Sequence, residues 1–143
     1  MEYLFLIFCL FIMLNDLTKR QIGNIVLIAT FIITISISDF MLTNKILVLL
    51  LVSTLSVLLF FVNFWAGGDG KLLIVLAPLF PPYQVIDLIV SILLCGGLLS
   101  LFYYLKYRVF FKHRMDRGLP YSVAIIIGAH LSLYFSQGLT IYS

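Results

Sequence analysis

The chain has 143 residues, of which 63% are hydrophobic and only 10% are charged. Its mean hydropathy is +1.18. A soluble domain carries about 25% charged residues, and a domain this small leaves much of its area in water. The composition therefore excludes an ordinary soluble domain. It predicts one integral membrane domain over residues 1–143, with the lipid bilayer as its solvent.

The cysteines exclude further kinds of site. Cys9 and Cys95 lie far apart in apolar runs and form no CxxC pair, whereas disulfide frameworks and zinc sites need grouped cysteines. We expect two buried thiols that pack as small apolar groups. No metal, cofactor or nucleic-acid partner is expected, and the oligomeric state is left open.

Apolar segments follow one another at about residues 2–18, 22–38, 45–65, 70–80, 84–105 and 120–137. A membrane-spanning helix needs about 20 residues, within a range of about 17–25. The segment 70–80 covers only about 16 Å, at about 1.5 Å per residue, and Pro81 and Pro82 end it. The first segment has neither a basic start nor a small-x-small cleavage site, so we expect a retained span rather than a signal peptide.

Basic residues predict the orientation. They gather in the first loop, at Lys19 and Arg20, and after the fifth segment, at Lys106, Arg108, Lys112, Arg114 and Arg117. The positive-inside rule places both loops in the cytoplasm. That requires an even number of crossings between them, so the short segment counts as a span. The expected fold is all-α and polytopic, with about six transmembrane helices and both termini outside.

Two aspartates stand at the ends of apolar segments on the expected cytoplasmic side. Asp16 ends the first segment, and Asp69 lies in a glycine-rich loop between a long segment and the short one. Ionisable residues at membrane depth are costly and tend to be functional. The remaining acidic residues are expected to be solvated in loops or at segment edges: Glu2, Asp39, Asp87 and Asp116.

Two carboxylates brought together suit peptide hydrolysis. Like charges at short range raise one pKa, so such a pair shares a proton. The ionised partner takes a proton from the attacking water, and the protonated partner donates to the carbonyl oxygen. The charge pattern alone equally allows ordinary ion pairs, of Asp16 with Lys19 or Arg20 and of Asp69 with Lys71.

Stretches in three parts of the chain resemble the type IV prepilin peptidases, which are polytopic aspartyl proteases. The first resembles their motif of an Asp before basic residues and Ile-Pro-Asn, and it reads Asp16-Leu17-Thr18-Lys19-Arg20-Gln21-Ile22-Gly23-Asn24. The second resembles their Gly-x-Gly-Asp motif, commonly followed by Lys-Leu, and it reads Ala66-Gly67-Gly68-Asp69-Gly70-Lys71-Leu72. The third, with Pro120 and Tyr121, resembles their Pro-Tyr stretch at the start of the last helix. Ala66 replaces a glycine and Gly23 a proline, but both carboxylates are kept.

The resemblance implies an intramembrane aspartyl endopeptidase with Asp16 and Asp69 as catalytic residues and no cofactor. Its substrate would be a prepilin or pseudopilin, whose short basic leader is removed at the cytoplasmic face of the bacterial inner membrane. Lacking CxxC motifs, the chain resembles the short, peptidase-only form of tight-adherence (Flp) pilus systems, without N-methyltransferase activity. Substrate-binding or loop-shaping roles are expected for Gly67, Gly68, Gly70, Lys71, Asn24, Pro120 and Tyr121.

Several roles stay open at this point. The substrate is expected to lie as an extended strand beside Gly67 and Gly68, where glycine exposes backbone for pairing. Lys71 either orients the Asp69 loop or snorkels to the interface, and His130 is expected to be a hydrogen-bonded interior residue. The alternatives to a peptidase are a non-catalytic membrane subunit and a proton-conducting transporter component. Carboxylates relay protons in such transporters, although usually near the bilayer midplane and across inverted repeats.

Overall fold

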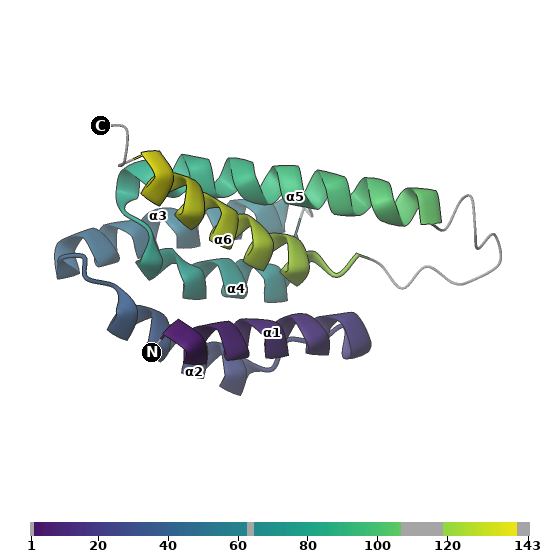
Figure 1. Ribbon diagram of the computed structural model, residues 1–143, viewed down its shortest axis with the longest axis horizontal. Helices are drawn as coiled ribbons and strands as arrows, with labels where there is room; N and C mark the ends of the chain where they lie inside the picture. The colour runs from purple at the N-terminus through teal and green to yellow at the C-terminus, as the bar shows by residue number, and fades with distance from the viewer. Residues whose placement is uncertain (1, 63–64, 107–118, 140–143) are drawn as a thin grey trace.

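The computed structural model of the chain describes residues 2–62, 65–106 and 119–139, and this part of the chain is all-α (Figure 1). The helices are α1 (Glu2–Lys19), α2 (Asn24–Ile37), α3 (Leu42–Phe61), α4 (Gly67–Leu76), α5 (Val85–Leu105) and α6 (Tyr121–Leu139). Two 3-10 turns, η1 (Ala77–Leu79) and η2 (Pro82–Gln84), join α4 to α5. Each α-helix falls on one predicted segment, so the all-α prediction is confirmed. The predicted basic loop falls mostly on 107–118, outside the described residues.

The short helix α4 lies inside the bundle and packs against α2, α3 and α6. Its buried residues are Asp69, Gly70, Leu72, Leu73, Val75 and Leu76. A helix with apolar residues on several faces is stable when other elements surround it. Thr34 of α2 donates its hydroxyl to the Val75 carbonyl at 2.8 Å, so a polar contact also fixes the far end of α4. Pro78, in η1, has no N–H to continue the helix.

The helices alternate in direction, so that several chain segments meet at one end. Figure 1 shows α1 ending on the right, where α2, α4 and α6 begin. Contacts between distant residues join these segments: Ser122 bonds Asp16, and Lys71 bonds Asn24. We call this the aspartate end of the bundle, defined by Asp16, Asn24, Asp69 and Ser122. The marked N-terminus lies at the opposite end.

Glycines set the spacing between α5 and α6. A Cβ atom added at Gly128 would lie 2.7 Å from the Ile92 Cα, inside any real contact distance. One added at Gly96 would lie 2.8 Å from the Cζ of Tyr121. The neighbouring Gly97 has nothing within 4 Å of an added Cβ. The two helices can therefore approach closely because Gly96 and Gly128 lack side chains.

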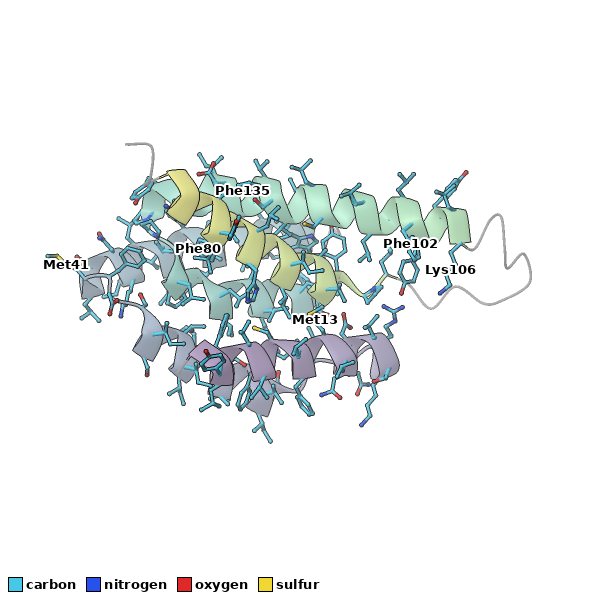
Figure 2. The ribbon with its side chains drawn as sticks, in the orientation of Figure 1. Met13, Met41, Phe80, Phe102, Lys106 and Phe135 are labelled. Carbon is cyan, nitrogen blue, oxygen red and sulfur yellow. The ribbon has the colours of Figure 1, made fainter. Side chains whose placement is uncertain are left out.

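Apolar side chains cover the outside of the bundle (Figure 2). Exposed examples occur on every long helix: Leu10, Ile28, Leu50, Leu94 and Tyr134. The protein buries only 17% of the apolar stretch of α3. It buries 22% of the apolar stretch formed by η2 and α5. The core helix of a soluble protein is mostly buried, so these helices do not resemble one. Soluble monomers rarely expose contiguous apolar areas of this extent.

Two helices in the described ranges are long and apolar enough to cross a membrane. They are α3 and the continuous helical stretch Pro82–Leu105. The helix α2 is apolar but has 14 residues, which cover about 21 Å, and α4 has only 10. The helix α1 includes three charged residues, Glu2, Asp16 and Lys19. Length and charge therefore identify two candidate spans, not the about six that were predicted.

Candidate active site

Asp16 lies in the last turns of α1 and is buried, with 8% of its surface exposed. It accepts two hydrogen bonds from Ser122, whose hydroxyl lies 2.5 Å and whose backbone N–H lies 3.3 Å from the same oxygen, Oδ2. Ser122 is in the first turn of α6, where backbone N–H groups have no partner within the helix. The positive end of a helix dipole also favours a nearby anion. The start of α6 thus stabilises a negative charge on Asp16.

Asp69 lies in the first turn of α4 and is buried as well, with 9% of its surface exposed. Gly67, Gly68 and Gly70 share this turn, so the predicted loop before the short helix is wrong at these residues: they are part of the helix. Ala66 forms the N-cap with an extended backbone, its carbonyl accepts the Asp69 backbone N–H at 3.0 Å, and its own backbone amide lowers the pKa of the Asp69 carboxyl group. This contact matches the reach-back bond of a capping box.

The negative charge of Asp16 acts on Asp69. Asp69 precedes the short segment 70–80 and lies outside both candidate spans. Burial and, second, the negative charge of Asp16 raise the pKa of Asp69 from 3.8 to about 6, although the hydrogen bond from Ala66 lowers it. Two like charges held close together do not both ionise easily. This arrangement favours a proton on Asp69 up to about pH 6, well above the usual range of an aspartate.

The bases that could have paired with these aspartates are engaged or placed elsewhere. Lys71 donates its ammonium group to the Asn24 side-chain oxygen at 3.3 Å, which ties α4 to α2. Lys19 is exposed, and Arg20 has a buried Nη1 with no hydrogen-bond partner among the described residues. The partner found for Asp16 is Ser122 rather than a base.

The glycines around Asp69 allow close packing. A Cβ added at Gly70 would lie 3.4 Å from the Ser56 Cβ, and one at Gly68 would lie 3.6 Å from Ile22. The Ser56 hydroxyl also donates to the Gly70 carbonyl at 3.4 Å. These contacts hold the first turn of α4 against α3 and against the connection between α1 and α2. The glycines therefore bring neighbouring elements close to Asp69.

Pro120 and Tyr121 fix the start of α6. Pro120 is buried just before the helix, and its carbonyl accepts the Val123 N–H at 3.2 Å. The Tyr121 ring packs against Trp65, with 6.0 Å between ring centroids, and against Gly96 of α5. Because Ser122 follows directly, these contacts also determine where its hydroxyl lies.

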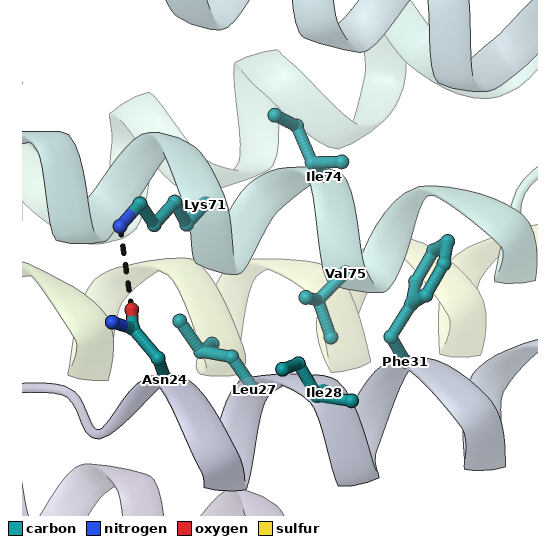
Figure 3. A pocket seen from close by; sticks show the side chains of 7 residues that line it. All are labelled: Asn24, Leu27, Ile28, Phe31, Lys71, Ile74 and Val75. Atoms are coloured by element: carbon teal, nitrogen blue, oxygen red, sulfur yellow. Dashed lines mark hydrogen bonds between the residues drawn. The ribbon is translucent and has the colours of Figure 1, made fainter.

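An open groove of about 330 Å³ runs between α2 and α4 (Figure 3). Its walls are apolar, formed by Leu27, Ile28, Phe31, Ile74 and Val75. The hydrogen-bonded pair of Asn24 and Lys71 lies at one end of the groove, and Phe31 lies at the other. The polar end belongs to the aspartate end of the bundle, so the groove leads from there along the two helices.

His130 lies on α6, two turns beyond Ser122. Its Nδ1 is 2.8 Å from the Ile126 carbonyl, and its ring stacks on Phe5 with 5.6 Å between centroids. This is the hydrogen-bonded interior position that was expected. His130 thus joins α6 to the start of α1, away from the aspartates.

Sequence reasoning missed Ser122. The available signal was its place just after Pro120 and Tyr121, at a helix start where free N–H groups attract anions. The sequence around Ser122 did not indicate that the anion bound at this helix start would be Asp16, which is 106 positions away in the chain.

A comparison of the chain with protein-family models, curated proteins and solved structures gives no match. Its function is therefore inferred from its residues and their geometry.

Proposed function

We propose that this protein is an intramembrane aspartyl endopeptidase that removes the short basic leader of type IV prepilin-like proteins. The observation that carries the proposal is the burial of Asp16 and Asp69 at one end of the bundle, with 8% and 9% of their surfaces exposed. Aspartates are almost never this buried unless they are paired. Neither has a basic partner among the described residues, and a carboxyl group as strongly perturbed as that of Asp69 is typical of an active site.

The proposed reaction uses one proton on the pair. Asp16 takes a proton from a water molecule, whose oxygen attacks the scissile carbonyl carbon, while Asp69 gives its proton to the carbonyl oxygen. The tetrahedral intermediate then collapses. Asp16 returns its proton to the leaving nitrogen, and a hydroxyl proton of the intermediate returns to Asp69 as the carbonyl re-forms. One water is consumed, the C–N bond breaks, and both aspartates regain their starting states.

In this proposal the protein is a multi-pass protein of the bacterial cytoplasmic membrane, with the aspartate end at the cytoplasmic surface. The apolar exterior and the two candidate spans support a bilayer environment. Lys19 and Lys71 lie at or next to the aspartate end, and Figure 2 shows Lys106 at the end of α5. Basic residues favour the cytoplasmic side, where a basic leader would also lie.

The substrate position differs from the one first expected. An extended strand beside Gly67 and Gly68 would need a free backbone edge, but these residues are helical and pack against Phe60 and Ile22. The groove between α2 and α4 offers a better place. Its apolar walls suit the hydrophobic segment that follows the leader, and its polar end adjoins the aspartate end.

The proposal is tested by coexpression with a type IV prepilin of the tight-adherence class. The expected result is a shorter prepilin on a gel, and mass spectrometry of its new N-terminus should show loss of the leader alone. A prepilin that keeps its leader in the presence of folded, membrane-inserted protein would contradict the proposal.

The cleavage rate is expected to fall as pH rises through about 6. Proton donation requires protonated Asp69, and its pKa is raised to about 6. Above that pH the fraction of Asp69 that is protonated falls about tenfold per pH unit, and the cleavage rate should fall with it. The check is a pH–rate profile of the purified protein in liposomes, from about pH 5 to about pH 8. A rate that increases across this interval would show that Asp69 is not the acid.

A further inference from the structure

Ser122 connects α6 to α1 through its side chain. It is fully buried, and its hydroxyl points to Asp16 of α1 rather than to its own helix. Its backbone N–H donates to the same oxygen. Ser122 is the second residue of α6, so no helical carbonyl lies one turn back for its hydroxyl to bond. The Ser122 hydroxyl is therefore directed at the carboxylate.

The two donors distinguish the oxygens of Asp16. A backbone N–H can only donate, so Oδ2 acts as an acceptor in this contact. The other oxygen, Oδ1, accepts no hydrogen bond from the described residues, which leaves it available to water. Asp69 has one contact of this kind, from the Ala66 amide. The environment thus favours the charge more strongly on Asp16 than on Asp69.

We propose that Ser122 is a positioning residue that holds Asp16 as the base that activates water and leaves the shared proton on Asp69. This inference rests on the proposed peptidase function. With Oδ2 fixed by Ser122, Oδ1 takes the proton from water, and Asp69 donates its own proton to the substrate carbonyl. Ser122 touches neither the water nor the peptide, so it acts only through Asp16.

The test compares Ser122→Ala with Ser132→Ala. Ser132 is on the same helix and also buried, with 4% of its surface exposed, but its hydroxyl has no partner within the described residues. Ser122→Ala should lower kcat by about 10- to 100-fold, the loss expected for one hydrogen bond to a charged group. KM should stay unchanged because the substrate does not contact Ser122. Ser132→Ala should match the unsubstituted protein.

Two further measurements separate positioning from a merely structural role. In Ser122→Ala the pH–rate profile should differ from that of the unsubstituted protein, because the Asp16 carboxyl group has lost one of its two hydrogen-bond donors. Ser122→Thr, which keeps a hydroxyl, should recover much of the rate. An unchanged profile with a lower melting temperature alone would overturn the proposal, as would equal kcat values for Ser122→Ala and Ser132→Ala.

A thermal-stability cycle tests the contact without any cleavage. Ser122→Ala should destabilise the protein more when residue 16 is Asp than in an Asp16→Asn background, since a charged acceptor strengthens the bond. Equal effects in the two backgrounds would overturn the contact on which the proposal rests. A clear difference in a protein that cleaves no prepilin would instead reject the peptidase function and leave the contact standing. If Ser122→Ala does not fold, Ser122→Cys provides a weaker donor of similar size for all three measurements.

Discussion

Replacing either Asp16 or Asp69 by asparagine is expected to abolish leader removal while leaving the protein in the membrane at normal levels. Asparagine has nearly the same shape as aspartate, but its amide can neither take a proton from water nor donate an acidic one. General acid–base groups contribute about 10²- to 10⁴-fold to rates, so each variant should fall below detection by gel shift. Quantitative mass spectrometry of the coexpressed prepilin measures the residual cleavage.

The fold should tolerate both changes. In Asp16→Asn the amide oxygen can still accept the Ser122 hydrogen bonds, and in Asp69→Asn a neutral amide of similar shape replaces a carboxyl group whose ionised form is costly to bury. Asp39→Asn and Asp87→Asn are matched controls, because both aspartates are exposed, and they should process normally. Full processing by both Asp16→Asn and Asp69→Asn would contradict the catalytic assignment. A proton leak through liposomes that depends on Asp16 and Asp69, without prepilin cleavage, would favour the transporter alternative.

Gly128→Ala is expected to destabilise the protein by about 2 kcal/mol, within the usual cost of overpacking. The added methyl group would lie 2.7 Å from the Ile92 Cα and 2.8 Å from its backbone nitrogen. A backbone cannot move aside as a flexible side chain can, so α5 and α6 must separate. Separation would also loosen Tyr121, which lies against Gly96 of α5.

Gly97→Ala is the matched control for this change. It adds the same methyl group on α5, but into open space. Alanine is favoured over glycine inside a helix by about 0.5–1 kcal/mol, so this variant should be as stable as the parent or slightly more stable. Thermal unfolding in detergent can be followed by the fluorescence of Trp65, the single tryptophan, which packs on Tyr121. Equal melting temperatures for the two variants would show that α5 and α6 are not held as closely as described.

The positions of the helices could be predicted from the sequence because apolar runs and their interruptions are local features. Pro81 and Pro82 were expected to end the short helix, but α4 already ends at Leu76, where the chain enters η1 with Pro78. The start of α4 was predicted less well. Glycines disfavour helices, but contacts of Gly68 with Ile22 and of Gly70 with Ser56 stabilise a helical turn that local propensity does not predict.

The candidate site was only partly predictable. Charge bias and a count of crossings placed Asp16 and Asp69 on one side, and they do lie together at one end of the bundle. The Ser122 contact could not be read from local pattern, because it depends on how α6 packs against α1. The groove could not be predicted from local sequence either, because it forms only where one face of α2 packs beside one face of α4. Tertiary packing determines both features.

The enclosure of α4 has a consequence for how the protein tolerates different membranes. Helices that contact lipid adjust to bilayer thickness by tilting, and the exposed apolar surfaces of α3 and α5 make them subject to this adjustment. The helix α4 has 10 residues and covers about 15 Å, and it is held by α2, α3 and α6. If the protein lies in a bilayer as proposed, contacts with neighbouring helices rather than with lipid set the position of Asp69.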